Sequence, residues 1–275
     1  MNLNVKIAGQ GYPILCLHGH PGSSQTMSVF TDVLARSHLT IAPDLRGYGR
    51  SPARGKFMMQ DHLDDLLRLL DQYQIEKCLL LGWSLGGILS LELALKQYDR
   101  GCDRFSGIIL VASAAYPRSN HPKTSILELI NTGIAGILNY FKPGWPWTIE
   151  LLGKRSLLHY LVENQTPAVY SYLGRQGVPA ALRTSWAATR ALNVELARGY
   201  NKLTELEKIK IPCLVLAGEC DRHITADSSA QTAQQLPQCD YICYPNTAHL
   251  FPWEIPERVN RDIQTWLETQ HSCKI

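Results

Sequence analysis

Short apolar runs recur along the chain and are separated by polar or glycine-containing turns. Six of these runs are four or five residues long and contain no charged side chain. Continuous apolar runs of this length are typical of strands that are buried on both faces, as in a parallel sheet. The predicted strands cover residues 14–17, 39–42, 78–81, 108–111, 213–217 and 241–244.

Helical periodicity fills most of the intervals between these strands. Apolar residues at 63, 66, 67, 70 and 73 recur with the spacing of one helix face, and residues 85–98 form a second apolar helix. A third stripe runs from Val259 to Leu267, and Pro256 stands where that helix would begin. Strands that alternate with helices predict an α/β fold with a parallel sheet.

Residues 114–204 break the alternation, because they are helix-like and contain no buried-strand pattern. The interval is rich in aromatic residues, Trp145, Trp147 and Trp186 among them. It could be a helical subdomain that packs its own aromatic side chains, or a lid inserted between two core strands, and the two interpretations are compatible. We therefore expect a core of residues 1–113 and 205–275 and a helical cap of residues 114–204.

Composition narrows the class of protein. The 275 residues are 45% hydrophobic and 19% charged, with a net charge of +3, so neither a disordered chain nor a nucleic-acid-binding domain is indicated. Eight cysteines occur without a Cys-x-x-Cys pair or zinc-site spacing, which is typical of reduced cytoplasmic thiols. With no secretion signal at the first residues and no apolar run of about 18 residues, we expect a cytoplasmic protein without a membrane span.

The net charge is unevenly distributed. The expected cap carries +6 and the remaining chain −3. The excess could be an ordinary solvated face, or it could steer an anionic substrate or an acidic carrier protein toward the cap. The basic residues are Arg118, Lys123, Lys142, Lys154, Arg155, Arg175, Arg183, Arg190, Arg198 and Lys202, and the acids are Glu128, Glu150, Glu163 and Glu195.

Ser84 stands in the sequence Gly82-Trp83-Ser84-Leu85-Gly86, between a predicted strand and a predicted helix. A serine on such a sharp turn has a strained backbone and an exposed hydroxyl, and glycines two residues away on either side leave room for it. The partial positive charge of the following helix N-terminus points at the same place. Ser84 is therefore the candidate nucleophile.

A nucleophilic serine needs a base, and the base needs a group that orients it. His249 follows the predicted strand 241–244, and Asp221 follows strand 213–217, so both lie at carboxyl ends of strands. Glu219 is the alternative acid, and His223 on the same loop is interpreted as solvated or pocket-lining. The end of strand 108–111 offers no carboxylate.

Two backbone N–H groups are expected to bind the oxyanion, those of His20 and Leu85. His20 belongs to the loop after strand 14–17, and Leu85 follows the serine. The side chains of His18 and Trp83 are further pocket-lining candidates, although a structural, hydrogen-bonded role is the alternative for His18. No metal site or cofactor is expected, and Asp44 and Arg46 are interpreted as a buried structural pair in a Gly-rich turn.

These motifs together resemble the α/β-hydrolase superfamily over residues 4–267. The matching segments are 18–22, 43–51, 82–86, 218–221 and 248–249. The resemblance implies a mostly parallel eight-stranded sheet flanked by helices, a triad of Ser84, Asp221 and His249, and a helical cap over the site. Epoxide hydrolases and haloalkane dehalogenases look similar but have an aspartate where this chain has Ser84. Residues 82–87 are also similar to the pimeloyl-ester carboxylesterases of biotin synthesis.

The hypothesis is a cofactor-free serine hydrolase, specifically a carboxylesterase that acts on a small or medium acyl ester. Alternatives on the same triad are thioester, lactone or carbon–carbon bond hydrolysis, cleavage of a pimeloyl-type methyl ester, and perhydrolysis. A non-catalytic ligand receptor is a further alternative. The expected partner is a small ester substrate, anionic or carrier-bound in one version, and the sequence indicates neither a nucleic-acid partner nor an oligomeric state.

Overall fold

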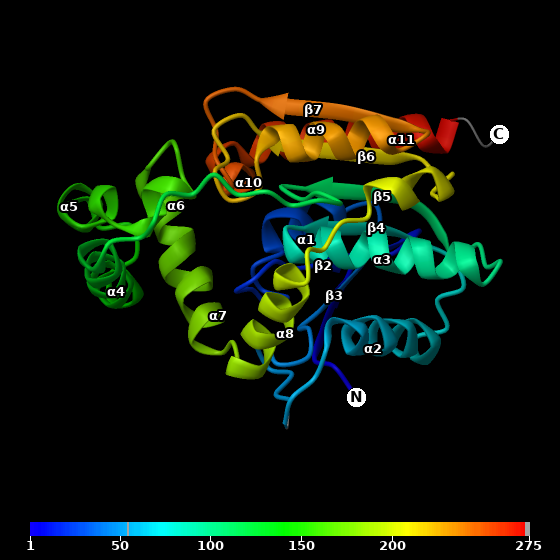
Figure 1. Cartoon of the computed structure of the whole chain (residues 1–275), viewed down its shortest axis with the longest axis horizontal. Helices are drawn as coiled ribbons and strands as arrows, with labels where there is room; N and C mark the ends of the chain where they lie inside the picture. The colour runs from blue at the N-terminus through cyan, green and yellow to red at the C-terminus, as the bar shows by residue number, and fades with distance from the viewer. Residues whose placement is uncertain (54, 273–275) are drawn as a thin grey trace.

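A twisted sheet with helices on both faces forms the main body of the molecule (Figure 1). The computed structural model describes residues 1–53 and 55–272. Six strands run parallel and β1 is antiparallel to its neighbour, in the order β1-β3-β2-β4-β5-β6-β7. The strands are β1 Val5–Ala8, β2 Pro13–Leu17, β3 Leu39–Pro43, β4 Cys78–Trp83, β5 Phe105–Val111, β6 Cys213–Gly218 and β7 Cys239–Tyr244.

The predicted parallel α/β sheet is confirmed, but the expectation of eight strands is wrong, because seven occur in the described part of the chain. All six strands predicted from apolar runs are present. The pattern missed β1, a four-residue edge strand in which Lys6 follows Val5 and Ile7 is exposed. A short strand with one neighbour and half-exposed side chains has no continuous apolar run to reveal it.

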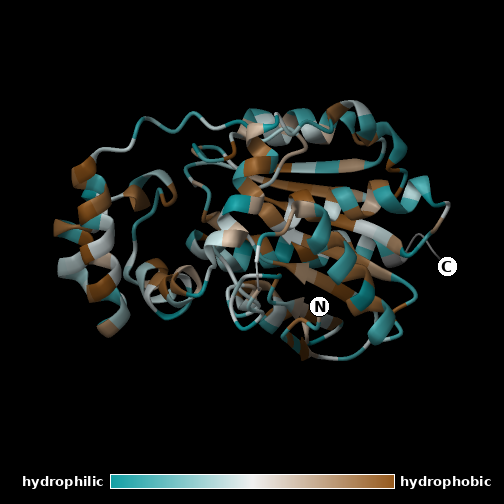
Figure 2. Cartoon of the chain, turned by 60° about the horizontal axis from the view of Figure 1, so that its bottom comes forward, coloured by the Kyte–Doolittle hydropathy of each residue, from teal (hydrophilic) through white to brown (hydrophobic). Residues whose placement is uncertain are grey.

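Strand side chains alternate between two hydrophobic cores, one on each face of the sheet. Leu15 and Leu80 belong to the core under α2 and α3, whereas Cys16 and Leu81 belong to the core under α1 and α11. Figure 2 shows the apolar strands enclosed by helices that are polar on their outer sides. The core helices are α1 Ser28–Leu34, α2 Met59–Gln72, α3 Leu85–Asp99, α9 Ala226–Gln235, α10 Phe251–Glu254 and α11 Pro256–Ser272.

The segment between β5 and β6 is helical throughout its described elements, as the sequence predicts. Figure 1 shows its first helices beyond the edge of the sheet where the strand arrows end, while α8 returns to the core. There Ala188 and Ala191 join the core under α2. The helices of this segment, called the insert below, are α4 Ile126–Phe141, α5 Pro146–Leu151, α6 Pro167–Tyr172, α7 Val178–Leu182 and α8 Trp186–Ala197.

The turn after β3 is held by two separate carboxylates. Asp44, which is 2% exposed, accepts hydrogen bonds from the backbone N–H groups of Ser24 and Arg50, at 2.6 and 2.8 Å. Arg46 instead forms a two-bond ion pair with Asp65 of α2, at 2.7 and 2.8 Å. The expected Asp44–Arg46 pair is therefore wrong: both residues are structural, but each has another partner.

No helix in residues 1–53 and 55–272 combines the length and apolar character needed to cross a bilayer.

The buried imidazole of His62 predicts a pH dependence of stability. Burial lowers its pKa to about 3, and its ring packs on Phe57 at 5.2 Å between centroids. Between about pH 3 and the ordinary histidine value of about 6.5, the unfolded chain binds more protons than the folded one, so stability rises with pH. His62→Leu should make this rise shallower by up to about 1.4 kcal/mol per pH unit.

Urea unfolding at several pH values measures the slope. Phe57→Leu is the matched control, because it disturbs the same ring contact without changing a titratable group. Equal slopes for wild type and His62→Leu would contradict the prediction.

Candidate active site

Ser84 lies at the sharp turn from β4 into α3, as the motif predicts. Its backbone has φ 53° and ψ −116°, a conformation that non-glycine residues rarely adopt. A side chain at Gly82 would place its Cβ 2.3 Å from the Gly86 carbonyl oxygen, and one at Gly86 would reach 2.0 Å from that of Leu17. Glycine at both positions is therefore what lets α3 begin directly behind the serine.

The side chains of Asp221 and His249 converge on this serine from two further strand ends. His249 Nδ1 lies 2.7 Å from Asp221 Oδ2, and His249 Nε2 lies 3.2 Å from Ser84 Oγ. The carboxylate fixes the tautomer, because Nδ1–H must donate to it and Nε2 is left to accept from the serine hydroxyl. A serine, an imidazole and a carboxylate in this chain of contacts can perform nucleophilic acyl transfer.

Burial and backbone contacts hold the three side chains in place. Ser84, Asp221 and His249 are 5%, 3% and 4% exposed. The second carboxylate oxygen of Asp221 accepts the backbone N–H groups of His223 and Ile224, at 2.8 and 2.9 Å. The aspartate is thus fixed by its own loop and presents only Oδ2 to the histidine.

The alternative residues on the Asp221 loop lie outside this chain of contacts. Glu219 is exposed, and its carboxylate accepts the backbone N–H of Asn246 at 3.0 Å. His223 is exposed, and its ring stands edge-on to that of His249 with 4.8 Å between centroids. His223 therefore borders the histidine, in a position where it could contact a substrate.

The loop after β2 lies against the serine. A Cβ on Gly19 would lie 3.1 Å from the Ser84 Cβ, so the backbone of the next residue, His20, is close to the nucleophile. Leu85 is the first residue of α3, where a backbone N–H has no partner inside its helix. These are the two N–H groups expected from the sequence, and both belong to segments that adjoin Ser84.

The side chains of both histidines of this loop, His18 and His20, have hydrogen-bond partners within the protein. His18 is fully buried, its Nε2 accepts the backbone N–H of Leu45 at 3.0 Å, and burial lowers its pKa to about 4. It does not line an open pocket, because both ring nitrogens have protein partners. Burial also lowers the pKa of His20 to about 4, and its Nδ1 is 2.9 Å from the Tyr48 hydroxyl.

Trp83 lies beneath the histidine rather than on an open wall. It is 5% exposed, and its ring centroid is 5.9 Å from that of His249. Trp253 makes an edge contact with Trp83 at 4.6 Å between ring centroids, and Tyr172 of the insert stacks on Trp253 at 4.5 Å. This aromatic column supports the base, and sequence reasoning missed Trp253 and Tyr172, because contacts across such distances in sequence leave no local pattern.

Ser113 is a second residue that sequence reasoning missed. It is fully buried, and its hydroxyl donates to the backbone carbonyl of Ser84 at 2.9 Å. It follows β5, which neighbours β4, so its position at the same sheet edge is the only signal that could have identified it.

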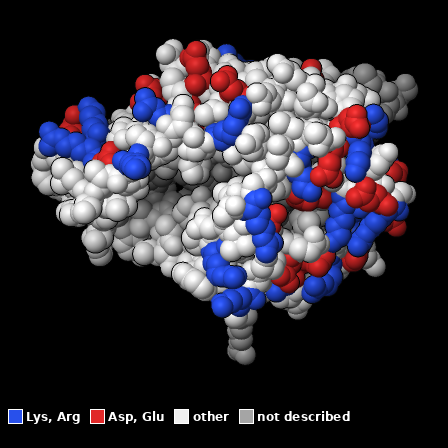
Figure 3. All heavy atoms as spheres, in the orientation of Figure 1, with Lys and Arg blue, Asp and Glu red and all other residues white. Residues whose placement is uncertain are grey.

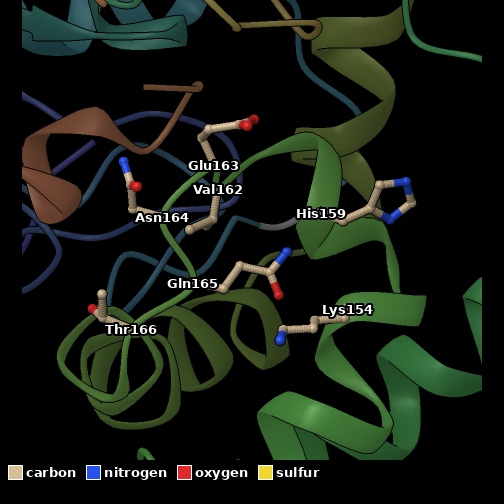
Figure 4. A pocket seen from close by; sticks show the side chains of 7 residues that line it. All are labelled: Lys154, His159, Val162, Glu163, Asn164, Gln165 and Thr166. Carbon is tan, nitrogen blue, oxygen red and sulfur yellow. The ribbon is translucent and has the colours of Figure 1, made fainter. Parts of the chain in front are cut away.

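A surface pocket in the insert is separate from these residues. Figure 4 shows the side chains that line it, which come from residues 154–166, and none belongs to Ser84, Asp221 or His249. Among the described residues no group of three or more His, Cys, Asp and Glu side chains could hold a metal ion. The lining residues are Lys154, His159, Val162, Glu163, Asn164, Gln165 and Thr166.

Comparison with known proteins finds relatives of the whole chain among hydrolases. AB hydrolase superfamily protein YisY of Bacillus subtilis is 25% identical over 262 residues, which cover 94% of this chain and 93% of that protein. The 2-hydroxymuconate semialdehyde hydrolase of Pseudomonas putida is 26% identical over 277 residues, covering 96% and 90%. A thermophilic esterase from Thermogutta terrifontis superposes with a TM-score of 0.71 at 25% identity, covering 98% and 94%.

A family model spans most of the chain. It matches residues 14–262, from β2 into α11, and therefore includes the serine turn and both loops that carry its partners. The protein is a member of the alpha/beta hydrolase family.

Proposed function

We propose that this hydrolase is a cofactor-free carboxylesterase that uses Ser84 as nucleophile, His249 as general base and Asp221 as its orienting carboxylate. The observation that carries the proposal is the continuous pair of contacts from Asp221 through His249 to Ser84, at 2.7 and 3.2 Å. The similarity to an esterase from Thermogutta terrifontis supports the ester class.

The reaction follows from these contacts in two steps. His249 Nε2 takes the hydroxyl proton while Ser84 Oγ attacks the ester carbonyl, and the backbone N–H groups of His20 and Leu85 stabilise the oxyanion. The imidazolium returns its proton to the leaving alcohol, and Asp221 stabilises its charge. Water, deprotonated by the same histidine, then hydrolyses the acyl-enzyme.

We further propose that residues 114–204 act as a cap over this site and residues 1–113 and 205–275 as the catalytic core. Figure 1 supports the division, since the insert lies at the edge of the sheet where the strands carrying the three residues end. The cap would shape the acyl pocket, with Tyr172 reaching the aromatic column beneath His249.

An anionic acyl ester is the proposed substrate class within this function. A pocket between core and insert is lined by Arg50, Arg175 and Arg183, with Lys6 and Asp44 also in its wall, and its lining residues do not include Ser84, Asp221 or His249. In the described part of the chain the three guanidinium groups have no ion-pair partner. Unpaired guanidinium groups attract carboxylate-bearing or phosphate-bearing molecules.

Ser84→Ala should abolish the covalent step. We expect kcat on a short p-nitrophenyl ester to fall by about 10³-fold or more, because no nucleophile remains. A fluorophosphonate probe should label the wild type and leave this variant unlabelled. Equal labelling would contradict the nucleophile, and a wild type that is labelled but inactive on esters would favour thioester, lactone, carbon–carbon or perhydrolysis chemistry.

Asp221→Asn should lower kcat by roughly 10⁴-fold, because the amide stabilises the wrong histidine tautomer. Glu219→Gln is the matched control on the same loop, since it removes a carboxylate that accepts the backbone N–H of Asn246 and does not contact His249 through a hydrogen bond in the described part of the chain. That variant should keep activity within about threefold of the wild type. The opposite ranking in steady-state kinetics would assign the orienting role to Glu219.

The double variant Arg175→Glu/Arg183→Glu should lower kcat/KM for an anionic ester about tenfold more than for a neutral one, with the difference shrinking at high salt. Arg190→Glu/Arg198→Glu is the control, because it changes the net charge equally within α8 and at the residue that follows it, and neither arginine lines this pocket. Equal losses for both esters, or for both double variants, would contradict anionic selectivity.

A further inference from the structure

Helix α4 of the insert is packed with its polar side inward. Ile126, Ile130, Ile134, Ile137, Leu127 and Phe141, called the α4 apolar face below, are between 44% and 80% exposed. At 100° per residue these six side chains occupy about 100° of the helix circumference. Over 16 residues they form a stripe about 24 Å long. Figure 2 shows this helix at the outer edge of the molecule, with hydrophobic segments along its length.

The inward side of α4 is anchored by hydrogen bonds rather than by apolar packing alone. Asn131 donates to the Arg155 carbonyl at 2.9 Å, and Asn139 donates to the Tyr170 carbonyl at 2.6 Å. Asn139 also accepts the backbone N–H of Gly144 at 2.8 Å. Rotating the helix to bury its isoleucines would break these bonds, so the outward apolar face is specified by the sequence. An exposed apolar stripe of this size marks an interaction surface.

The charged side chains around the α4 apolar face indicate which kind of partner would bind it. Lys123 precedes α4, Lys142 follows it, and Arg155 lies on the neighbouring turn, all exposed and without an ion-pair partner in the described part of the chain. Of the acids nearby, Glu150 pairs with Lys154 at 2.7 Å, while Glu128 keeps its charge and accepts hydrogen bonds from the neutral groups of Ser125 and Tyr160. In Figure 3, Lys and Arg side chains lie at this end of the molecule with Asp and Glu side chains among them. A second copy on a twofold axis would bring the three cations that lack an ion-pair partner together, whereas an anionic surface neutralises them.

Aromatic residues complete the pattern at the carboxyl end of α4. Phe141 is 80% exposed, Trp147 is about half exposed, and the Lys142 ammonium lies 4.5 Å from the Trp145 ring. Aromatic rings beside lysines are characteristic of segments that bind at the headgroup level of a bilayer. With 16 residues, α4 is too short to span a bilayer, which takes about 20.

We propose that the α4 apolar face docks on anionic lipid bilayers, with α4 lying in the plane of the surface and Lys123, Lys142 and Arg155 among the headgroups. The apolar side chains enter the boundary between headgroups and acyl chains. This docking is independent of the proposed esterase activity, because no residue of the α4 face belongs to the active site.

Vesicle co-sedimentation tests the proposal. The full chain is mixed with phosphatidylcholine vesicles that contain roughly one third phosphatidylglycerol, and with pure phosphatidylcholine vesicles. Wild type and Ser84→Ala should bind the anionic vesicles equally, and more tightly than the neutral ones. Ile130→Asp/Ile137→Asp should weaken binding at least about tenfold. Circular dichroism and a thermal melt establish that each variant is folded.

The matched control is Leu182→Asp/Trp186→Asp, which adds the same charge at two other exposed apolar positions of the insert, 75% and 68% exposed. It should retain vesicle binding. Lys123→Glu/Lys142→Glu should weaken binding and reduce its salt dependence. Equal loss in the Leu182/Trp186 control would overturn the proposal. A wild type that does not bind anionic vesicles would also overturn the proposal. In that case, a dimer that is seen by ultracentrifugation and dissociated by Ile130→Asp/Ile137→Asp would assign the face to a second copy of the chain.

Discussion

The close approach of α3 to β2 is the constraint on which the site depends. The Gly86 backbone reaches the carbonyl of Leu17 so closely that a Cβ there would be 2.0 Å from the oxygen. Together with the absence of a side chain at Gly82, this contact lets a helix begin immediately behind Ser84 while the residue keeps its positive φ. It also brings the loop after Leu17, which contains His20, against the serine. The nucleophile and both expected oxyanion donors are therefore positioned by one backbone contact in the centre of the sheet.

The base is positioned differently, because its loop is shared between core and insert. The carboxylate of Glu254 accepts the backbone N–H of Ala248 at 3.0 Å and that of Asn164 at 2.7 Å. The backbone N–H of Leu250 donates to the carbonyl of Leu161 at 2.8 Å. The histidine between residues 248 and 250 is thus tied on both sides to the insert. Changes in the insert can therefore reach the imidazole without touching a substrate, through loop position alone.

Local sequence patterns predicted the parts of the molecule that are locally determined. Parallel strands buried on both faces have continuous apolar runs, and their carboxyl ends identify where Ser84, Asp221 and His249 would meet. Strand β1 escaped because Lys6 and Ile7 face solvent or its boundary. The ion-pair partner of Arg46 was not predicted either. An aspartate lies two residues away in the sequence, yet Arg46 pairs with Asp65 on α2. Opposite charges that are near in sequence carry no information about a helix that packs alongside.

The orientation of helix α4 is a further feature that its local sequence pattern does not determine. A period of 3.6 residues separates an apolar face of a helix from a polar one. The usual assumption is that the apolar face is buried against the rest of the protein. Here that assumption fails, because the buried side chains of α4 include those of Asn131 and Asn139, which donate to the backbone carbonyls of Arg155 and Tyr170. Exposed apolar surface costs free energy, but that cost disappears when another apolar phase covers the helix. The free energy of the folded protein is therefore lower when an apolar surface outside the chain covers the exposed isoleucines of α4.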